Sequence, residues 1–173
     1  WYGVRPDIWC FGKVIGGGLP MGAFGANREI MSNLAPLGGV YQAGTLSGNP
    51  LATAAGLAAL GHLTTDAYER LSGIATRLQE GMLDAFAAAG VAAVMPRVGP
   101  LLGLFFTDAA PHDFDSAKVA ADNGVYQRFF HGMIERGVAL APGAYEALFP
   151  SLAHSDTEID ATVAAVAEVA ATL

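Results

Sequence analysis

Apolar residues recur at steps of three and four along the middle of the chain. This spacing predicts an amphipathic helix from about Asp66 to Ala89, which Gly90 ends. Its apolar face consists of Ala67, Leu71, Ile74, Leu78, Met82 and Phe86. A similar spacing predicts a final helix over 157–173, with Ile159, Val163, Val166 and Ala170 on one side.

Shorter apolar runs bounded by glycine or proline predict strands. They cover 8–11, 21–25, 91–95, 101–107 and 138–141, and the first is expected to be buried. Helices are predicted over 28–34, 50–60 and 115–136, the last with a break at Asn123 and Gly124. The order of strands and helices indicates an α/β or α+β protein, with a boundary near residues 61 to 66.

The composition narrows the class of partner. Apolar residues make up 53% of the 173 residues, which is enough for a packed core, while charged residues make up only 14%. The net charge is −7 and the sequence contains no basic stripe. Both features argue against nucleic acid or an anionic membrane as a partner.

The cysteine count and the hydropathy indicate a compartment. Cys10 is the single cysteine, so an internal disulfide is excluded, and we expect it to be a small buried residue. No apolar run reaches the roughly 20 residues that span a membrane. Arg5, Pro6 and Asp7 interrupt any signal-peptide pattern. We therefore expect a cytoplasmic protein, and the start at Trp1 without methionine indicates a segment of a longer one.

Lys13 is the first candidate for chemistry. It follows the predicted buried strand and precedes the three glycines at 16 to 18. A buried ammonium is costly unless it is paired, neutral or chemically converted, and glycines let a ligand approach the backbone. The arrangement favours a lysine that forms a Schiff base with a carbonyl cofactor.

Familiar nucleotide and hydrolase motifs do not fit the glycine-rich segments. A dinucleotide fingerprint that starts at Gly16 would need glycine where Met21 stands, and Lys13 precedes the glycines instead of following them as in a P-loop. The stretch 44–48 resembles a nucleophile elbow, but Ser47 is one place too late.

The segment from Gly44 to Pro50 leaves two interpretations open. Small residues and two hydroxyls precede a helix start at Asn49 and Pro50, where free N–H groups favour an anion. A plain capped loop would use the same residues.

Glu146 is flanked by apolar residues after the last predicted strand. This setting suits a site carboxylate, but a partly exposed loop glutamate is the simpler interpretation. The four histidines have no metal-ligand spacing. For His154, the histidine nearest to Glu146 in the sequence, a structural hydrogen bond is expected.

Three segments together resemble a known family. Lys13 with its glycine turn, the stretch 41–50 (YQAGTLSGNP) and the stretch 146–154 (EALFPSLAH) occur in the same order in class III, pyridoxal-phosphate-dependent aminotransferases. The similarity covers essentially the whole chain, as the C-terminal part of those proteins. The glutamate at position 146 resembles the aminomutases of this family, because many transaminases of the family have arginine in this region.

The resemblance implies a fold-type I transferase and its site residues. Residues 1–62 would end the large cofactor-binding domain, and 63–173 would form the C-terminal small domain. Lys13 is similar to the lysine that forms the Schiff base with pyridoxal phosphate (PLP) and moves protons. Gly44 and Thr45 resemble the pair that reaches the cofactor phosphate of the neighbouring subunit in a homodimer, and Glu146 resembles a residue that shapes the substrate end of the pocket.

The implied reaction is the isomerisation of glutamate-1-semialdehyde to 5-aminolevulinate for tetrapyrrole synthesis. Only twelve residues precede Lys13, so the family's phosphate-binding turn, ring-stacking aromatic and pyridine-pairing aspartate are absent. We therefore expect the isolated chain to be inactive. Two alternatives stay open: another class III transaminase that acts on amines or ω-amino acids, and a non-catalytic fragment.

Overall fold

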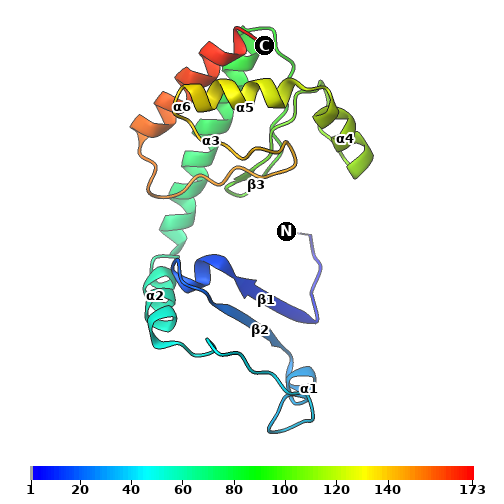
Figure 1. Ribbon diagram of the computed structural model, residues 1–173, viewed down its shortest axis with the longest axis vertical. Coiled ribbons are helices and arrows are strands. Elements are labelled where there is room, and N and C mark those ends of the chain that lie inside the picture. The colour runs from blue at the N-terminus through cyan, green and yellow to red at the C-terminus, as the bar shows by residue number, and fades with distance from the viewer. Residues whose placement is uncertain (1) are drawn as a thin grey trace. The chain divides into compact units, whose positions relative to one another are not determined.

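The computed structural model describes residues 2–173. The chain forms two compact units, Trp1–Thr64 and Thr65–Leu173 (Figure 1). The first unit contains a two-stranded sheet, a short 3-10 turn and two helices. Their bounds are β1 (Ile8–Gly12), η1 (Lys13–Gly16), β2 (Gly22–Ala26), α1 (Arg28–Met31) and α2 (Pro50–Gly61).

The two strands of the first unit pair antiparallel, from Ile8 opposite Ala26 to Gly12 opposite Gly22. All five residues of β1 are exposed, so the prediction of a buried strand is wrong. The prediction that Cys10 is buried is wrong for the same reason. Within residues 2–173 this sheet has only two strands, and no further strand extends it. An apolar run therefore predicted the strand but not what covers it.

Side-chain caps fix the two helices of the first unit. The Asn49 carboxamide accepts hydrogen bonds from the Leu51 and Ala52 amides, and α2 begins at Pro50 as predicted. The helix predicted over 28–34 is shorter, because α1 ends at Met31. Ser32 and Asn33 bond the carbonyl of Glu29 with their side chains, which competes with continuation of the helix.

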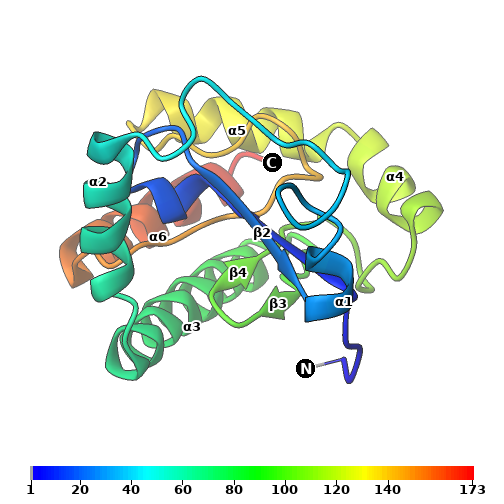
Figure 2. The same ribbon diagram turned by 90° about the horizontal axis from the view of Figure 1, so that it is seen from below.

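The second unit is mainly helical. Its elements are α3 (Thr65–Ala88), β3 (Arg97–Val98), β4 (Leu101–Leu102), α4 (Phe114–Asp122), α5 (Val125–Glu135) and α6 (Asp156–Ala170). Helix α6 packs along α3 and against α5, and β4 lies beside α3 (Figure 2). The predicted helices over 66–89 and 157–173 are confirmed within a few residues. Gly124, with φ 74°, separates α4 from α5 at the predicted break.

One aromatic cluster forms the centre of the second unit. Phe86, Phe106 and Phe129 meet edge to face at centroid distances of 5.2 to 5.4 Å. Leu78, Met82 and Phe86 are buried as the helical spacing predicted, whereas Ala67, Leu71 and Ile74 are partly exposed. The other fully buried side chains include Leu102, Leu104, Met133, Val166 and Val169.

The predicted strands of the second unit are mostly wrong. The segments 91–95 and 101–107 are joined only by the isolated bridge Val94–Phe105, and β4 pairs instead with β3, which lies outside both segments. Pro96 and Pro100 lack the N–H groups that a longer ladder needs. The segment 138–141 forms no strand, and the Ala141 carbonyl accepts its hydrogen bond from the Tyr126 hydroxyl instead. None of the described helices has both the length and the apolar character to cross a membrane.

Candidate functional site

Lys13 has an unusual backbone. It is the first residue of η1 and has φ 57°, the only positive φ of a non-glycine residue among residues 2–173. This left-handed conformation is strained for a residue with a Cβ, and such strain concentrates at functional positions. The side chain is exposed, so the expectation of a buried ammonium is wrong. Nothing in the described chain forms a hydrogen bond or ion pair with its amine.

The glycine turn packs closely on α2. A Cβ at Gly17, where φ is 58°, would lie 2.4 Å from the Ala55 carbonyl oxygen. Gly16 is buried, with the Met21 side chain 3.1 Å from a hypothetical Cβ. Only Gly18 of the three has open space at this point. Gly16 and Gly17 thus allow close packing against other residues of the chain. Of the three glycines, only Gly18 leaves the space that the predicted approach of a ligand requires.

An open groove of about 500 Å³ lies beside the end of the hairpin. It is lined by Pro20, Met21, Gly22, Gly44, Thr45, Leu46, Ser47, Gly48, Asn49 and Ala52. Gly22 pairs with Gly12, the residue before Lys13. Gly44 and Thr45 therefore lie near the end of the strand pair that precedes Lys13, although Lys13 itself does not line the groove.

The loop on this groove presents unpaired polar groups. The Ser47 amide donates to the Gly44 carbonyl at 2.9 Å, whereas the Thr45 amide and hydroxyl have no partner within residues 2–173. The first free amides of α2 are not available, because Asn49 caps them. The predicted helix start with Asn49 as its cap is confirmed. Any anion would have to be held by Thr45 and its neighbours in the loop.

Glu146 lies in the second unit, on the loop that follows α5. Its side chain is exposed, and its amide donates to the Gly143 carbonyl at 3.1 Å. A nearby group that the sequence analysis missed is Tyr126 of α5. Burial raises the pKa of the Tyr126 phenol, and the charge of Glu146 raises that pKa further. The three- and four-residue spacing of Tyr126, Phe129 and Met133 could have predicted a core tyrosine here.

His154 has the structural role predicted for it. Its Nδ1 accepts a hydrogen bond from the Ser151 amide at 2.9 Å. Among residues 2–173, no three His, Cys, Asp or Glu side chains are grouped so that they could hold a metal ion.

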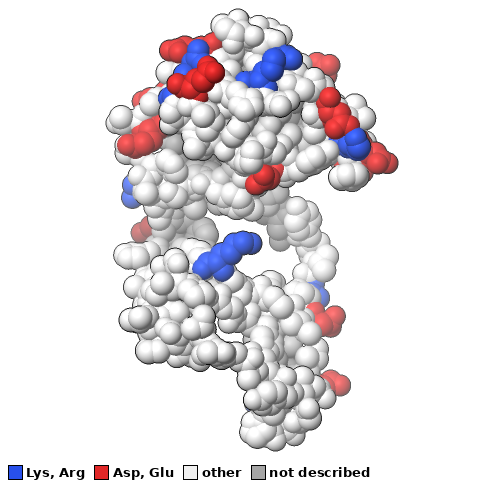
Figure 3. Space-filling model, in the orientation of Figure 1, with Lys and Arg blue, Asp and Glu red and all other residues white. Residues whose placement is uncertain are grey.

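Charges are distributed unevenly between the units. Arg5, Asp7, Lys13, Arg28 and Glu29 are the only charged residues before Thr65. Figure 3 shows most of the blue and red atoms of this face over the second unit. Trp9 and Phe11 of β1 are 53% and 54% exposed, and their rings stack at 6.3 Å. Lys13 therefore follows a largely uncharged, apolar surface.

Comparison with known proteins decides the family. The family described as aminotransferase class-III matches residues 1–169. The chain belongs to this family. A glutamate-1-semialdehyde 2,1-aminomutase of Desulforapulum autotrophicum is 52% identical over 99% of this chain, and the chain spans 40% of that relative's length.

Solved structures support the class III assignment. The chain is similar to an ω-transaminase from Sphaerobacter thermophilus, with 28% identity and a TM-score of 0.83. The match covers 97% of this chain and 39% of the transaminase chain. It is also similar to a transaminase with PLP bound, with 26% identity and a TM-score of 0.81. This match covers 98% of this chain and 39% of the other. The expected family and the fold-type I architecture are confirmed.

A glutamate-1-semialdehyde aminomutase from Pseudomonas aeruginosa, solved with PMP, has the same fold. The match covers 97% of this chain and 39% of the aminomutase chain, with a TM-score of 0.82. Its identity is 22%, so this likeness extends to the fold alone.

Proposed function

We propose that this chain is part of a PLP-dependent aminomutase that converts glutamate-1-semialdehyde to 5-aminolevulinate. The 52% identity to the Desulforapulum aminomutase carries this proposal. The protein would act in the cytoplasm, as its cysteine usage and hydropathy indicate, and as a homodimer, as the family resemblance implies. Residues 1–62 would complete the large cofactor-binding domain, and 63–173 would be the C-terminal small domain.

Lys13 is proposed as the lysine that binds the cofactor aldehyde. Its amine makes no hydrogen bond or ion pair with residues 2–173, and its strained backbone fixes where the side chain starts. When bound, PLP supplies an electron sink for the carbon that loses a proton. The Lys13 amine would take up and release the protons that move between carbon atoms while the amino group changes place.

Gly44 and Thr45 are proposed to hold the phosphate of the cofactor in the neighbouring subunit. The unpaired Thr45 amide and hydroxyl are suitable donors for phosphate oxygens. A Cβ at residue 44 would lie 2.9 Å from the Ser47 Oγ, so glycine keeps this loop compact. The open groove leaves room for an anion at these donors.

Glu146 is proposed to shape the substrate end of the pocket. Its carboxylate is exposed, and its backbone amide closes a short turn by donating a hydrogen bond to the Gly143 carbonyl. A carboxylate at this place accepts hydrogen bonds from a substrate amino group and repels a second carboxylate. This property favours an aminomutase over a transaminase that would use arginine to bind a keto acid.

A hybrid enzyme tests the proposal. The 173 residues replace the matching segment of the Desulforapulum aminomutase, whose remaining 60% supplies the missing part of the protein. We expect 5-aminolevulinate to form from the semialdehyde and PLP without any added amino acceptor, because an aminomutase keeps the amino group on one substrate. Lys13→Ala should abolish turnover.

Lys118→Ala is the matched control, because Lys118 is the other lysine of the chain and pairs with Asp122 on α4. Turnover that requires an added keto acid would favour the class III transaminase alternative. A folded, PLP-loaded hybrid without either activity would favour the non-catalytic fragment.

A further inference from the structure

The loop that carries Glu146 is held at both ends by the core of the second unit. At its start, the Tyr126 hydroxyl donates to the Ala141 carbonyl at 2.7 Å. Near its end, Leu148 and Leu102 exchange two backbone hydrogen bonds of 2.7 and 3.2 Å. Glu146 lies between these attachments, so its position depends on both.

The attachment at Ala141 has a rigid base. Tyr126 is 5% exposed, and its ring contacts Phe106 and Phe129 at centroid distances of 6.4 and 6.3 Å. Close packing of this kind restricts the rotamers of the ring and so holds its hydroxyl in position. The Ala141 carbonyl is thereby held at a defined distance from α5.

The middle of the loop is arranged around the glutamate. A Cβ at residue 143 would lie 3.2 Å from the Glu146 Oε1, so the carboxylate folds back over Gly143. The Glu146 charge adds to burial in raising the pKa of the Tyr126 phenol, which places the carboxylate and the phenol within electrostatic range of each other. Tyr126 is therefore connected to Glu146 through the loop and through space.

We infer that Tyr126 is a positioning residue, whose hydroxyl bond to Ala141 sets the place of Glu146 at the substrate end of the site. This inference rests on the proposed role of Glu146. Tyr126 would act on substrate binding only through the loop. It would have no part in cofactor binding, which is proposed for residues of the other unit.

Hydrogen exchange on the 173-residue chain tests the positioning directly. Tyr126→Phe removes only the hydroxyl and keeps the packed ring. Loss of one hydrogen bond should speed exchange of the Glu146 and Leu148 amides about fivefold. Amides of α6, such as that of Val166, should keep their rates. Tyr68→Phe is the matched control, since Tyr68 is a half-exposed α3 tyrosine with no hydroxyl partner in residues 2–173. Equal acceleration of all amides, or none in the loop, would overturn the inference.

A second variant does not depend on the folding of Tyr126→Phe. Glu146→Gln keeps the hydroxyl and removes the charge, so the ultraviolet titration of Tyr126 should move to lower pH. The same variant with Tyr126→Phe should show no such shift. A titration that Glu146→Gln leaves unchanged would contradict the proximity on which the inference depends.

The hybrid enzyme separates positioning from general structure. Tyr126→Phe should raise the KM for the semialdehyde about fivefold and change kcat less, with unaltered PLP absorbance. In a Glu146→Ala background the same change should have no further effect, because the residue acts through Glu146. An equal effect in both backgrounds would overturn the inference. If the hybrid forms no 5-aminolevulinate, the proposed function fails, whereas the exchange and titration experiments still decide the placement of the loop.

Discussion

Gly56 of α2 lies directly against the carbonyl oxygen of Ile15, and a Cβ at residue 56 would sit only 2.2 Å from that oxygen. Ile15 belongs to η1, the turn that begins at Lys13. Gly17 makes a similar approach to Ala55 from the other side of the contact. Two glycines on opposite elements thus allow the turn and the helix to touch, and this contact holds the backbone of Lys13 in place.

Gly56→Ala should therefore destabilise the first unit. The added methyl overlaps backbone atoms, which cannot rotate away, and such overpacking costs about 1–3 kcal/mol. Trp9 belongs to this unit and the second unit contains no tryptophan, so tryptophan fluorescence during urea unfolding reports on the first unit selectively. Gly61→Ala is the control, because a Cβ there meets nothing within 4 Å. It should be neutral or stabilising, and equal losses in both variants would contradict the close contact.

The aromatic cluster predicts a large effect in the second unit. Phe129 has 0% exposure and touches Phe86 and Phe106. Phe129→Ala should lower the free energy of unfolding by about 3–5 kcal/mol, because it leaves a cavity as well as losing buried area. Helical circular dichroism measures this loss. Phe114→Ala, at a 69% exposed position, should cost far less. Similar losses in the two variants would show that the cluster is not the core.

The cap of α6 predicts a pH dependence. Hydrogen bonds from the Ser155 side chain and backbone lower the pKa of Glu158 from its ordinary value of 4.5. The group binds protons more weakly in the folded chain, so its stabilisation is complete above about pH 4.5. It is lost as the pH falls through the lower folded pKa. Glu158→Gln should lower the melting temperature at pH 7 and lower it less at pH 3.

Glu80→Gln provides the control for this cap. Glu80 is an exposed α3 glutamate without a hydrogen bond or ion pair to residues 2–173. Its substitution should give the same small change at both pH values. A Glu158→Gln effect that does not depend on pH would contradict the role of the ionised cap.

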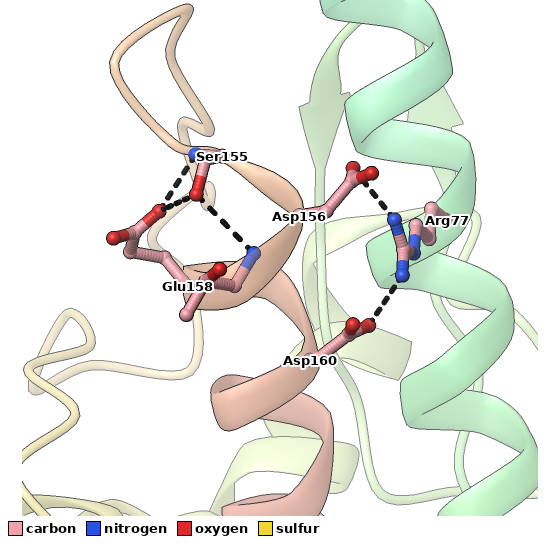
Figure 4. A network of polar contacts seen from close by, with 6 residues as sticks. Arg77, Ser155, Asp156, Glu158 and Asp160 are labelled. Atoms are coloured by element: carbon pink, nitrogen blue, oxygen red, sulfur yellow. Dashed lines mark hydrogen bonds and ion pairs between the residues drawn. The ribbon is translucent and has the colours of Figure 1, made fainter.

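The ion pairs of Arg77 are expected to contribute little by comparison. Arg77 on α3 reaches Asp156 and Asp160 of α6 at 2.6 Å each (Figure 4). All three side chains are largely exposed, so water and salt screen the attraction. Arg77→Met should lower the melting temperature much less than Phe129→Ala, and raising the salt concentration should reduce the difference from the parent chain. A salt-independent loss as large as that of Phe129→Ala would contradict this ranking.

The isolated chain is expected to form no 5-aminolevulinate. The chain spans 40% of the length of the aminomutase to which it is similar. Incubation of the purified chain with PLP and the semialdehyde measures this. Turnover by the chain alone would show that the 173 residues contain a complete site.

The helices could be predicted from the sequence because their signals are local. Asn49 and Pro50 at the start of α2, and Gly124 between α4 and α5, act on neighbouring residues and need no tertiary information. The strands failed because pairing is not local. The expected strand over 91–95 forms only the isolated bridge Val94–Phe105, and at Ala141 a tyrosine from α5 takes the place of a strand partner.

The candidate site was predicted unevenly for related reasons. Lys13 stood out by its neighbours, but its exposure depends on what covers β1, which no local pattern specifies. Tyr126 was missed because nothing in its own segment shows that its hydroxyl reaches Ala141, fifteen residues further along the chain. Contacts between distant residues decide such roles, and only the structure supplies them.

The proposed function depends above all on Lys13 as the lysine that binds PLP. The chain has two lysines, Lys13 and Lys118, which form an internal comparison. The hybrid enzyme is loaded with PLP, reduced with borohydride, digested and analysed by mass spectrometry. We expect a phosphopyridoxyl group on the Lys13 peptide and none on the Lys118 peptide. An unlabelled Lys13, or equal labelling of the two lysines, would contradict it.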